Sequence, residues 1–599
     1  MTKQSDSRYT VHNFIISLLG TLLFPSLLSD TSTCISNSVF SILFFLCLFL
    51  LLNTASNSCF HSKRHVFCSI SLGTLFSIMI GFGYALKVNG EVMFHNCLFI
   101  LAILIYSYIF GIILNYAWTI IDTTDVAVTN IVNSVLSFIF NHPYLLVIFF
   151  FICWFPCFLG IFPGGFIYDA TREFYQVTDG FNQNFPMLHS YIVIKLLSTS
   201  YSLTGGYNTG IAIYAIIQML AFAILFMQIA KEFYQENVHP YLIIIIISYC
   251  AFFPLIPMFT TYILRDIMFG GLLTASIFLV FLMTRDPIHF FSSSFRVVET
   301  ALILALTLIS RNNNAGTVVI ILVIILSLLI CFSMCKYSIK GASILSISLV
   351  TIFIIVSKLL SSFCTPITPA TAGASMSLFS QQLARTYILT GEEWSEEDIS
   401  ELNSYMFVEG LSYAYTPEDA DNTKHRLDIN NRVPDFLKFW AKIGLRYPGI
   451  YVDAALANTR QMWDPDSIID GYNKGSTAYD SFDKCYYAYW SGIEEPGVYM
   501  NIAPKINAFY NKIGLYISFE RIPVISMLFS IGFQFWFVLF CLFKNIASKN
   551  RTLYLPIMIL LLYSIICAFV PLILARYFCA LFLAFPITFI LTFSKRAHN

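Results

Sequence analysis

Long apolar runs alternate with short polar connections along most of this chain. A helix that crosses the roughly 30 Å hydrocarbon layer needs about 20 residues, and about fourteen runs approach that length. They are centred near residues 11–30, 39–52, 66–86, 95–118, 143–162, 209–230, 240–259, 266–283, 298–310, 317–334, 342–360, 523–543, 553–570 and 577–594. Residues 361–522 break the pattern with dense polar and charged side chains. The pattern predicts an all-α polytopic membrane protein with one large, mainly helical polar domain.

The composition supports a membrane protein. Hydrophobic residues make up 57% of the chain and charged residues 11%, and the mean hydropathy is +0.73. One soluble core cannot hide that much apolar surface. The 34 basic and 34 acidic residues cancel, which argues against a nucleic-acid partner because a polyanion binder needs a basic excess. Cys364 and Cys485 are the two cysteines of the polar segment, and a disulfide between them is an open alternative.

The distribution of Lys and Arg predicts the orientation. Basic residues of short loops are retained on the cytoplasmic side, and about fourteen of them lie on one side of the predicted spans. The opposite short loops hold about six by the same count. These six are Lys87, Arg172, Lys195, Arg265, Arg311 and Arg576. We therefore expect both termini in the cytoplasm of a plasma-membrane protein, and residues 361–522 on the extracytoplasmic face.

Four of those outer residues are arginines at the ends of spans: Arg172, Arg265, Arg311 and Arg576. Each could snorkel to lipid head groups or pair with a nearby carboxylate such as Asp266. A shared ligand is the alternative, because guanidinium groups bind phosphate in a bidentate manner. Four arginines at one face suit a lipid-linked phosphate whose tail stays in the bilayer.

The stretch "FPGGFIYDATREFYQV" follows the fifth predicted span. Its proline and paired glycines end that span, and Asp169 and Glu173 then lie on one face of a short helix. Asp179 and His189 follow in the same loop. The carboxylates suit a general base, or a divalent cation (Mg²⁺ or Mn²⁺) held by Asp169 and Glu173. A surface ion-pair cluster of Asp169, Arg172 and Glu173 is the structural alternative.

This loop resembles the first extracytoplasmic loop of the GT-C superfamily of integral-membrane glycosyltransferases. The chain is more closely similar to an uncharacterised group of bacterial polytopic membrane proteins. That resemblance rests on "YDATREFYQ", "FPMLHS", "LRD" at 264–266, "SRNNNAG" at 310–316, "FSQQLARTYI" at 379–388, "YTPEDADNTK" at 415–424 and "ARYF" at 575–578. The matches cover most of the chain after about residue 140.

The GT-C resemblance implies an enzyme that moves a sugar from a polyprenyl-phosphate donor to a cell-surface glycan or lipid-linked acceptor. By this resemblance Asp169 stands at the position of the catalytic acidic residue, and we expect it to act as the base with Glu173 and His189 assisting. The residues that we expect to bind substrate are Arg172, Arg265, Asp266, Arg311, Asn312, Gln382, Arg385, Arg576 and Tyr577. Membrane lipid is the remaining expected partner.

The implied domain order has four parts. Residues 1–140 hold about four leading helices, and 141–360 form a GT-C-like core with the catalytic loop 163–208. Residues 361–522 form the extracytoplasmic domain, and 523–599 hold about three final helices. The GT-C pattern instead places its catalytic loop directly after the first span, so the leading helices would be an added module.

The polar segment contains a helix-start signature in "TGEEWSEEDISEL". Ser395 is the expected N-cap, and acidic residues fill the first turn up to Asp398. This favours a solvated helix face over a site.

Two other functions remain open from the sequence. A flippase or transporter for a lipid-linked oligosaccharide predicts ionisable residues in the middle of several spans, and these are scarce. A glycan polymerase would use similar outer arginines, and the sequence separates it poorly from simple transfer.

Overall fold

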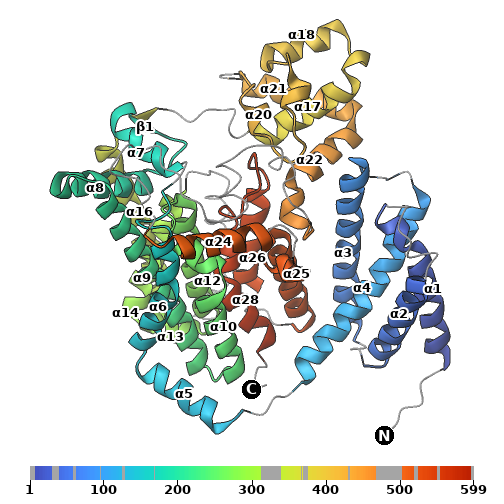
Figure 1. Cartoon of the computed structure of the whole chain (residues 1–599), viewed down its shortest axis with the longest axis horizontal. Coiled ribbons are helices and arrows are strands. Elements are labelled where there is room, and N and C mark those ends of the chain that lie inside the picture. The colour runs from blue at the N-terminus through green and yellow to red at the C-terminus, as the bar shows by residue number, and fades with distance from the viewer. Residues whose placement is uncertain are drawn as a thin grey trace. The chain divides into compact units, whose positions relative to one another are not determined.

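The computed structural model (Figure 1) describes most of the chain. The described residues are 7–29, 39–58, 62–92, 94, 96–124, 128–166, 169–311, 339–365, 367–368, 376–429, 432–466, 502–517, 522, 524–549 and 554–594. The chain forms two compact units. The first comprises residues 1–127, 378–467 and 536–554, and the second comprises 128–377, 468–535 and 555–599.

The first unit combines long apolar helices with a group of shorter polar ones. Its elements are α1 (Ser7–Leu27), α2 (Val39–Ser58), α3 (Lys63–Asn89), α4 (Cys97–Thr123), most of α17 (Ser377–Thr390), η4 (Gly391–Glu393), α18 (Glu396–Tyr405), α19 (Leu411–Ala414), α20 (Asp421–Lys424), α21 (Val433–Arg446), α22 (Pro448–Trp463) and most of α25 (Ile531–Ala547). Figure 1 shows α3 and α4 side by side along their length.

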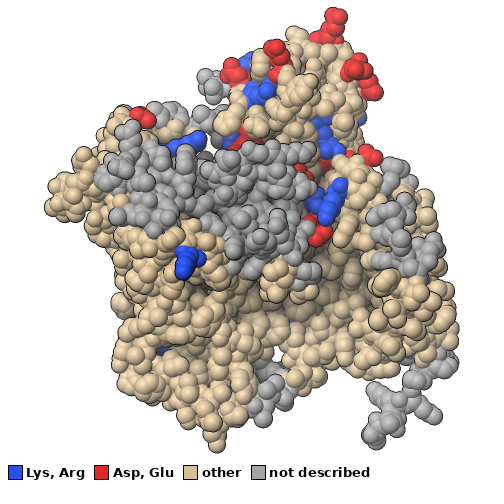
Figure 2. All heavy atoms as spheres, in the orientation of Figure 1, with Lys and Arg blue, Asp and Glu red and all other residues tan. Residues whose placement is uncertain are grey.

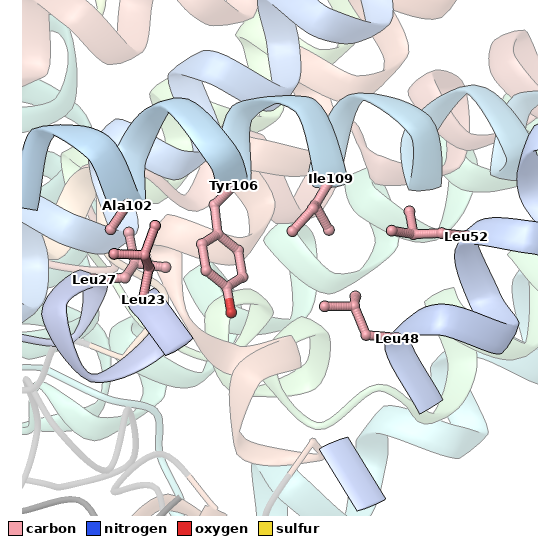
Figure 3. Close-up of a cluster of buried hydrophobic side chains, with 7 residues drawn as sticks. All are labelled: Leu23, Leu27, Leu48, Leu52, Ala102, Tyr106 and Ile109. Atoms are coloured by element: carbon pink, nitrogen blue, oxygen red, sulfur yellow. The ribbon is translucent and has the colours of Figure 1, made fainter. Parts of the chain in front are cut away.

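The core of the leading helices comes from three of them. Figure 3 shows buried side chains of α1, α2 and α4 pointing toward one another: Leu23, Leu27, Leu48, Leu52, Ala102, Tyr106 and Ile109. The Tyr106 hydroxyl donates to the carbonyl of Gly20 (2.8 Å), so the one polar group of this cluster is satisfied. Exposed apolar residues cover the outside of the same helices, as expected of surfaces that face lipid.

The described part of the polar segment within this unit is helical, from α17 to α22. On the face shown in Figure 2, charged side chains gather over these helices, whereas most of the remaining described surface is uncharged. The predicted start of α18 is confirmed: the Ser395 hydroxyl accepts from the backbone N–H of Asp398 (3.1 Å). The sequence predicted that the acidic residues of this turn lie on a solvated face. For Asp398 that prediction is wrong, because its carboxylate is buried against Lys442 and Arg446 of α21.

The second unit is larger and also helical. Its elements are α5 (Asn130–Asn141), α6 (Tyr144–Gly160), α7 (Asp169–Asp179), β1 (Phe181–Asn182), α8 (Met187–Thr204), α9 (Asn208–Gln235), α10 (Pro240–Phe252), α11 (Leu255–Thr260), α12 (Arg265–Arg285), α13 (Pro287–Ser292), α14 (Ser294–Ile309), α16 (Ile339–Phe363), β2 (Ile367–Thr368), α24 (Pro504–Ile517), η6 (Ser526–Phe529), α26 (Tyr554–Cys567), α27 (Cys579–Leu583) and α28 (Phe585–Phe593). The two-residue strands β1 and β2 pair in parallel.

The helices α12 and α16 of this unit differ in how much of their surface is buried. In the most apolar window of α12, 78% of residues are buried, whereas the corresponding value for α16 is 11%. An apolar helix with so little protein around it needs lipid to cover it. The helix α12, by contrast, packs against α9, α14 and α27 and begins with Arg265 and Asp266.

Seven helices of the described residues are long and apolar enough to cross a membrane: α1 to α4, α9, α12 and α16. The bent pair of α5 and α6 would make an eighth span. The chain is therefore an all-α membrane protein. The expected 240–259 span is divided between α10 and α11, and the expected 577–594 span between α27 and α28. The 317–334 run lies outside the described residues, so about fourteen spans remain a prediction.

The four-part domain order also remains a prediction. It divides the chain by its expected position in the membrane, whereas the two units divide the chain by contacts between residues, so the units do not test it. Cys364 is a buried free thiol in the described structure, packed near Phe181 and Ile194. Its suggested partner, Cys485, lies outside the described residues.

Candidate functional site

A backbone tether brings the starts of α7 and α12 together. After α6 ends at Gly160, Gly165 forms a parallel bridge with Tyr262, in which its N–H donates to the carbonyl of Thr261 (3.0 Å). The N–H of Ile263 donates back to Gly165 (2.9 Å). A β-carbon on Gly165 would lie 2.3 Å from the Tyr262 ring, so only glycine fits this approach. The helices α7 and α12 begin shortly after the tether.

A buried amide supports the other strand of this tether. The side-chain nitrogen of Gln218, in the middle of α9, donates to the carbonyls of Thr260 (2.9 Å) and Tyr262 (2.8 Å). These carbonyls belong to the break between α11 and α12, where no helix supplies donors. Gln218 thus holds the backbone that leads into Arg265.

The buried face of α7 packs on α8 and places Glu173 against His189. Gln176 fixes this contact: its amide nitrogen donates to the Ser190 hydroxyl (3.2 Å) and its amide oxygen accepts from the N–H of Asn182 (2.9 Å). A Glu173 carboxylate oxygen lies in hydrogen-bond contact with His189 Nδ1, and both side chains are fully buried. The other ring nitrogen, Nε2, has no protein partner among the described residues.

Arg265 lies between the two carboxylates of α7. Its Nη2 is 3.1 Å from Asp169 Oδ2, and its Nη1 is 3.4 Å from Glu173 Oε1. The guanidinium also lies over the Phe185 ring, with 4.6 Å to the centroid. One arginine therefore joins Asp169 to the buried Glu173 and His189 pair.

Asp266, the next residue of α12, pairs with a different arginine. Arg311 Nη1 lies 3.1 Å from Asp266 Oδ1 and donates to the Tyr563 hydroxyl (2.6 Å). Rings of Phe269, Tyr563 and Tyr577 surround this guanidinium at centroid distances of 5.3, 5.5 and 5.7 Å. Neighbouring helix residues point in different directions, which explains why Arg265 and Asp266 do not pair with each other.

Arg576 closes the cluster from the segment between α26 and α27. Its Nη2 lies 3.7 Å from Asp169 Oδ2 and donates to the Tyr577 hydroxyl (3.1 Å). The Tyr577 carbonyl accepts from the Tyr563 hydroxyl (2.9 Å), which links this segment to the Arg311 pair. The cluster therefore contains three carboxylates, three guanidinium groups and one imidazole, which we call the Asp169 cluster. It consists of Asp169, Glu173, His189, Arg265, Asp266, Arg311 and Arg576.

The surface ion-pair hypothesis for α7 is wrong. Glu173 is fully buried and contacts His189 and Arg265, whereas Arg172 is exposed on the helix surface. Asp179 is exposed at the end of α7, where it accepts from Thr178 (2.9 Å).

Two other predicted residues have their partners within the first unit. Gln382 and Arg385 belong to α17 in the first unit. Gln382 donates to the Tyr451 carbonyl (3.0 Å), and Arg385 donates to the Gly90 carbonyl (2.5 Å). Asn312 lies outside the described residues.

The arrangement of α7 does not fit a metal ion between Asp169 and Glu173. Arg265 occupies the position between these carboxylates and already supplies positive charge there. No group of three or more His, Cys, Asp or Glu side chains in the described part of the chain could hold a metal ion.

The sequence analysis missed Phe185, Gln218, Phe269 and Tyr563. Phe269 and Tyr563 lie in the apolar helices α12 and α26, where aromatic residues are common. The sequence therefore gives no sign that these two residues contact an arginine. Gln218 did carry a signal, because it is an uncharged polar residue inside the run "IAIYAIIQMLAFAILF". A buried amide in a membrane helix requires partners.

Comparison with known families adds one assignment. Residues 181–599 match the model of DUF6020, a family of unknown function. The chain belongs to this family. The match includes His189, Arg265, Asp266, Arg311 and Arg576 of the Asp169 cluster, and it begins after Asp169 and Glu173. No curated protein and no solved structure matches this member of DUF6020.

Proposed function

We propose that this member of DUF6020 is a membrane glycosyltransferase. It moves a sugar from a polyprenyl-phosphate donor to a hydroxyl of a cell-surface glycan or lipid-linked acceptor. The observation that carries the proposal is the Asp169 cluster, in which three arginines from separate segments, each largely but not fully buried, pair with the carboxylates of Asp169, Glu173 and Asp266.

The arginines supply the chemistry that a phosphate requires. The side chains of Arg265, Arg311 and Arg576 are 18%, 15% and 6% exposed, so they lie in surroundings where charge is weakly screened. Guanidinium groups bind phosphate oxygens in a bidentate manner and stabilise the negative charge of a leaving phosphate. The carboxylates of Asp169 and Asp266 hold these arginines in place.

Asp169 is the proposed base. It is 14% exposed, more than the fully buried Glu173, so it is the more accessible of the two α7 carboxylates. The acceptor oxygen attacks the anomeric carbon while Asp169 takes the hydroxyl proton. The bond between that carbon and the phosphate oxygen breaks, and its electron pair leaves with the polyprenyl phosphate. A single displacement of this kind inverts the anomeric configuration.

Glu173 and His189 position the other members of the cluster. His189 holds Glu173, and Glu173 holds one side of Arg265, so the guanidinium keeps a fixed orientation toward Asp169. No step of the proposal passes through a divalent cation.

The proposal includes a membrane topology of about fourteen spans and a GT-C-like arrangement. The Asp169 cluster and residues 361–522 then lie on the extracytoplasmic face of the plasma membrane, and both termini lie in the cytoplasm. The supporting evidence is the unequal distribution of Lys and Arg between alternate loops.

The test is the surface-glycan composition of cells that lack the gene and carry a plasmid copy. The wild-type copy should restore one sugar that the deletion strain lacks, and Asp169→Asn should not restore it. Asp179→Asn is the matched control, because it makes the same substitution at an exposed position of the same helix. It should restore the sugar fully.

Several outcomes would overturn the proposal. Restoration by Asp169→Asn shows that this residue is not the base. Loss of chain length with no missing sugar indicates a polymerase, and accumulation of the complete lipid-linked glycan inside the cell indicates a flippase. Immunoblots of isolated membranes establish that each variant is inserted at the wild-type level.

A further inference from the structure

A second site lies at the opposite end of α6 from the Asp169 cluster. It is an open hollow of about 890 Å³ between α5, the last turn of α9 and the segment before α10, and most of its polar lining residues are exposed; we call it the α5 cavity. Figure 1 shows α5 at one end of α6 and α7 near the other end. At 1.5 Å per residue, the 17 residues of α6 separate the two ends by about 25 Å. The two sites therefore do not share residues.

The helix α5 is amphipathic without being charged. Its Leu136 and Phe140 are buried, and the Phe140 ring stacks on Tyr234 of α9 at 4.5 Å. On a second face, Ile131 and Val135 are 76% and 51% exposed, and Phe138, which is 59% exposed, lies between this face and the cavity that it also lines. The helix bends by 96° from α6. We take α6 alone as the membrane-crossing part of this bent pair, which leaves α5 along the membrane surface with these apolar side chains toward the acyl chains.

The third face of α5 is polar and lines the cavity. Asn133, Ser134, Ser137 and Asn141 recur at helical spacing, and Gln235 and Asn237 face them. Among the described lining residues none is charged. Two carboxylates close in sequence are paired elsewhere: Glu232 with Arg296 (3.7 Å) and Glu236 with Arg285.

We propose that this cavity binds the neutral, hydroxyl-rich head group of a membrane glycolipid. Amide and hydroxyl side chains donate to and accept from sugar hydroxyls, whereas no lining cation is present to neutralise a phosphate. The Tyr234 ring adds an apolar wall of the kind that sugar rings pack against. The position of α5 along the membrane surface places the cavity at the level of lipid head groups.

The cavity volume fits this occupant. Ligand pockets commonly measure about 300 to 1,000 Å³, which accommodates a head group of one or two sugars. The exposed apolar face of α5 gives the acyl chains of the same lipid an adjacent surface to pack on. The inference concerns a separate site and does not rest on the proposed glycosyl transfer.

The test uses the full chain in phosphatidylglycerol nanodiscs that also contain monoglucosyl diacylglycerol. Native mass spectrometry measures the glycolipid that the released protein retains. We expect enrichment over phosphatidylglycerol in the wild type. We expect Asn133→Leu to lower the retained glycolipid about fivefold, because it removes one amide contact. Ser137→Phe, which replaces a lining hydroxyl group with a bulky ring, should lower retention further without removing a buried group.

Asn130→Leu is the matched control, since it makes the same substitution on an exposed position of α5 outside the cavity lining. It should retain glycolipid as the wild type does. Equal loss in Asn130→Leu would overturn the proposal, as would equal retention of phosphatidylglycerol and glycolipid. A third arm offers methyl glucoside, which has no lipid chain; if it competes as well as the glycolipid does at equal concentration, the occupant is a free sugar and the lipid assignment is wrong.

Discussion

Glu173 and Asp398 are both buried carboxylates that contact two basic groups, but their partners differ. Asp398 binds Lys442 (2.7 Å) and Arg446 (2.8 Å), which come from one helix and are 46% and 41% exposed. Glu173 binds His189 and Arg265, which come from two helices and are 0% and 18% exposed. The basic partners of Asp398 remain largely hydrated. The basic partners of Glu173 have lost most of their contact with water.

This difference separates a stabilising contact from a costly one. Solvated cations lose little hydration when they pair, so the Asp398 contacts contribute modestly and without a large penalty. Burying several charges costs several kcal/mol per ion, and apolar residues often replace such pairs without loss of stability. The Asp169 cluster retains six formal charges in that environment. Function is the simplest reason for keeping them.

Removal of Glu173 should give the largest loss of stability. Glu173→Ala leaves His189 and one side of Arg265 without a partner in the interior, which should lower the free energy of unfolding by about 3 to 5 kcal/mol. Thermal unfolding in detergent micelles measures the effect. Glu401→Ala is the control, because Glu401 pairs with Lys442 at an exposed position and should cost about 0 to 1 kcal/mol. Equal losses would remove the distinction between the two regions.

Gly165→Ala should have the next largest effect. The new methyl group would meet the Tyr262 ring at 2.3 Å, so the tether that aligns α7 with α12 must shift. We expect a loss of about 1 to 3 kcal/mol. Gly449→Ala, at the start of α22, meets no atom within 4 Å and should change stability by less than about 0.5 kcal/mol. If both variants unfold at the same temperature, the close approach is not a constraint.

Asp398→Asn should give a smaller, pH-dependent loss. The hydrogen bond from Lys442 is the main cause that lowers the pKa of Asp398, followed by burial, which opposes it, and the bond from Arg446. A lowered folded-state pKa contributes stability above the ordinary value near 3.9, and that contribution is lost as pH falls through the folded value. We expect a cost of about 1 to 2 kcal/mol at neutral pH.

Unfolding curves at several pH values between about 6 and 3 check this sign. The difference in the free energy of unfolding between wild type and Asp398→Asn should become smaller as the pH falls toward 3. A gap that is constant with pH would mean that the carboxylate charge does not contribute.

Hydropathy predicted the helices well where a run is uninterrupted. The expected 66–86 and 266–283 segments correspond to α3 (Lys63–Asn89) and α12 (Arg265–Arg285). It failed inside the expected 240–259 segment, where the chain breaks at Phe253 and Pro254 between α10 and α11. Proline has no N–H to continue a helix, and a hydropathy average does not register that property.

The candidate site was only partly accessible to the same reasoning. Loop topology selected Asp169, Arg265, Arg311 and Arg576, which the structure brings together. It also selected Arg172, which the structure leaves exposed on α7. Side-chain direction decides between these arginines, and it follows from packing that spacing alone does not specify.

Binding of polyprenyl monophosphate tests the central claim most directly. Purified full-chain protein in nanodiscs is titrated with this lipid, with size-exclusion profiles confirming that each variant is folded. Wild type and Arg172→Gln should bind equally, and Arg576→Gln should bind at least about tenfold more weakly, because it loses a buried charge-assisted contact. Equal binding by wild type and Arg576→Gln, or equal weakening in Arg172→Gln, would contradict the assignment of the Asp169 cluster as a lipid-phosphate site.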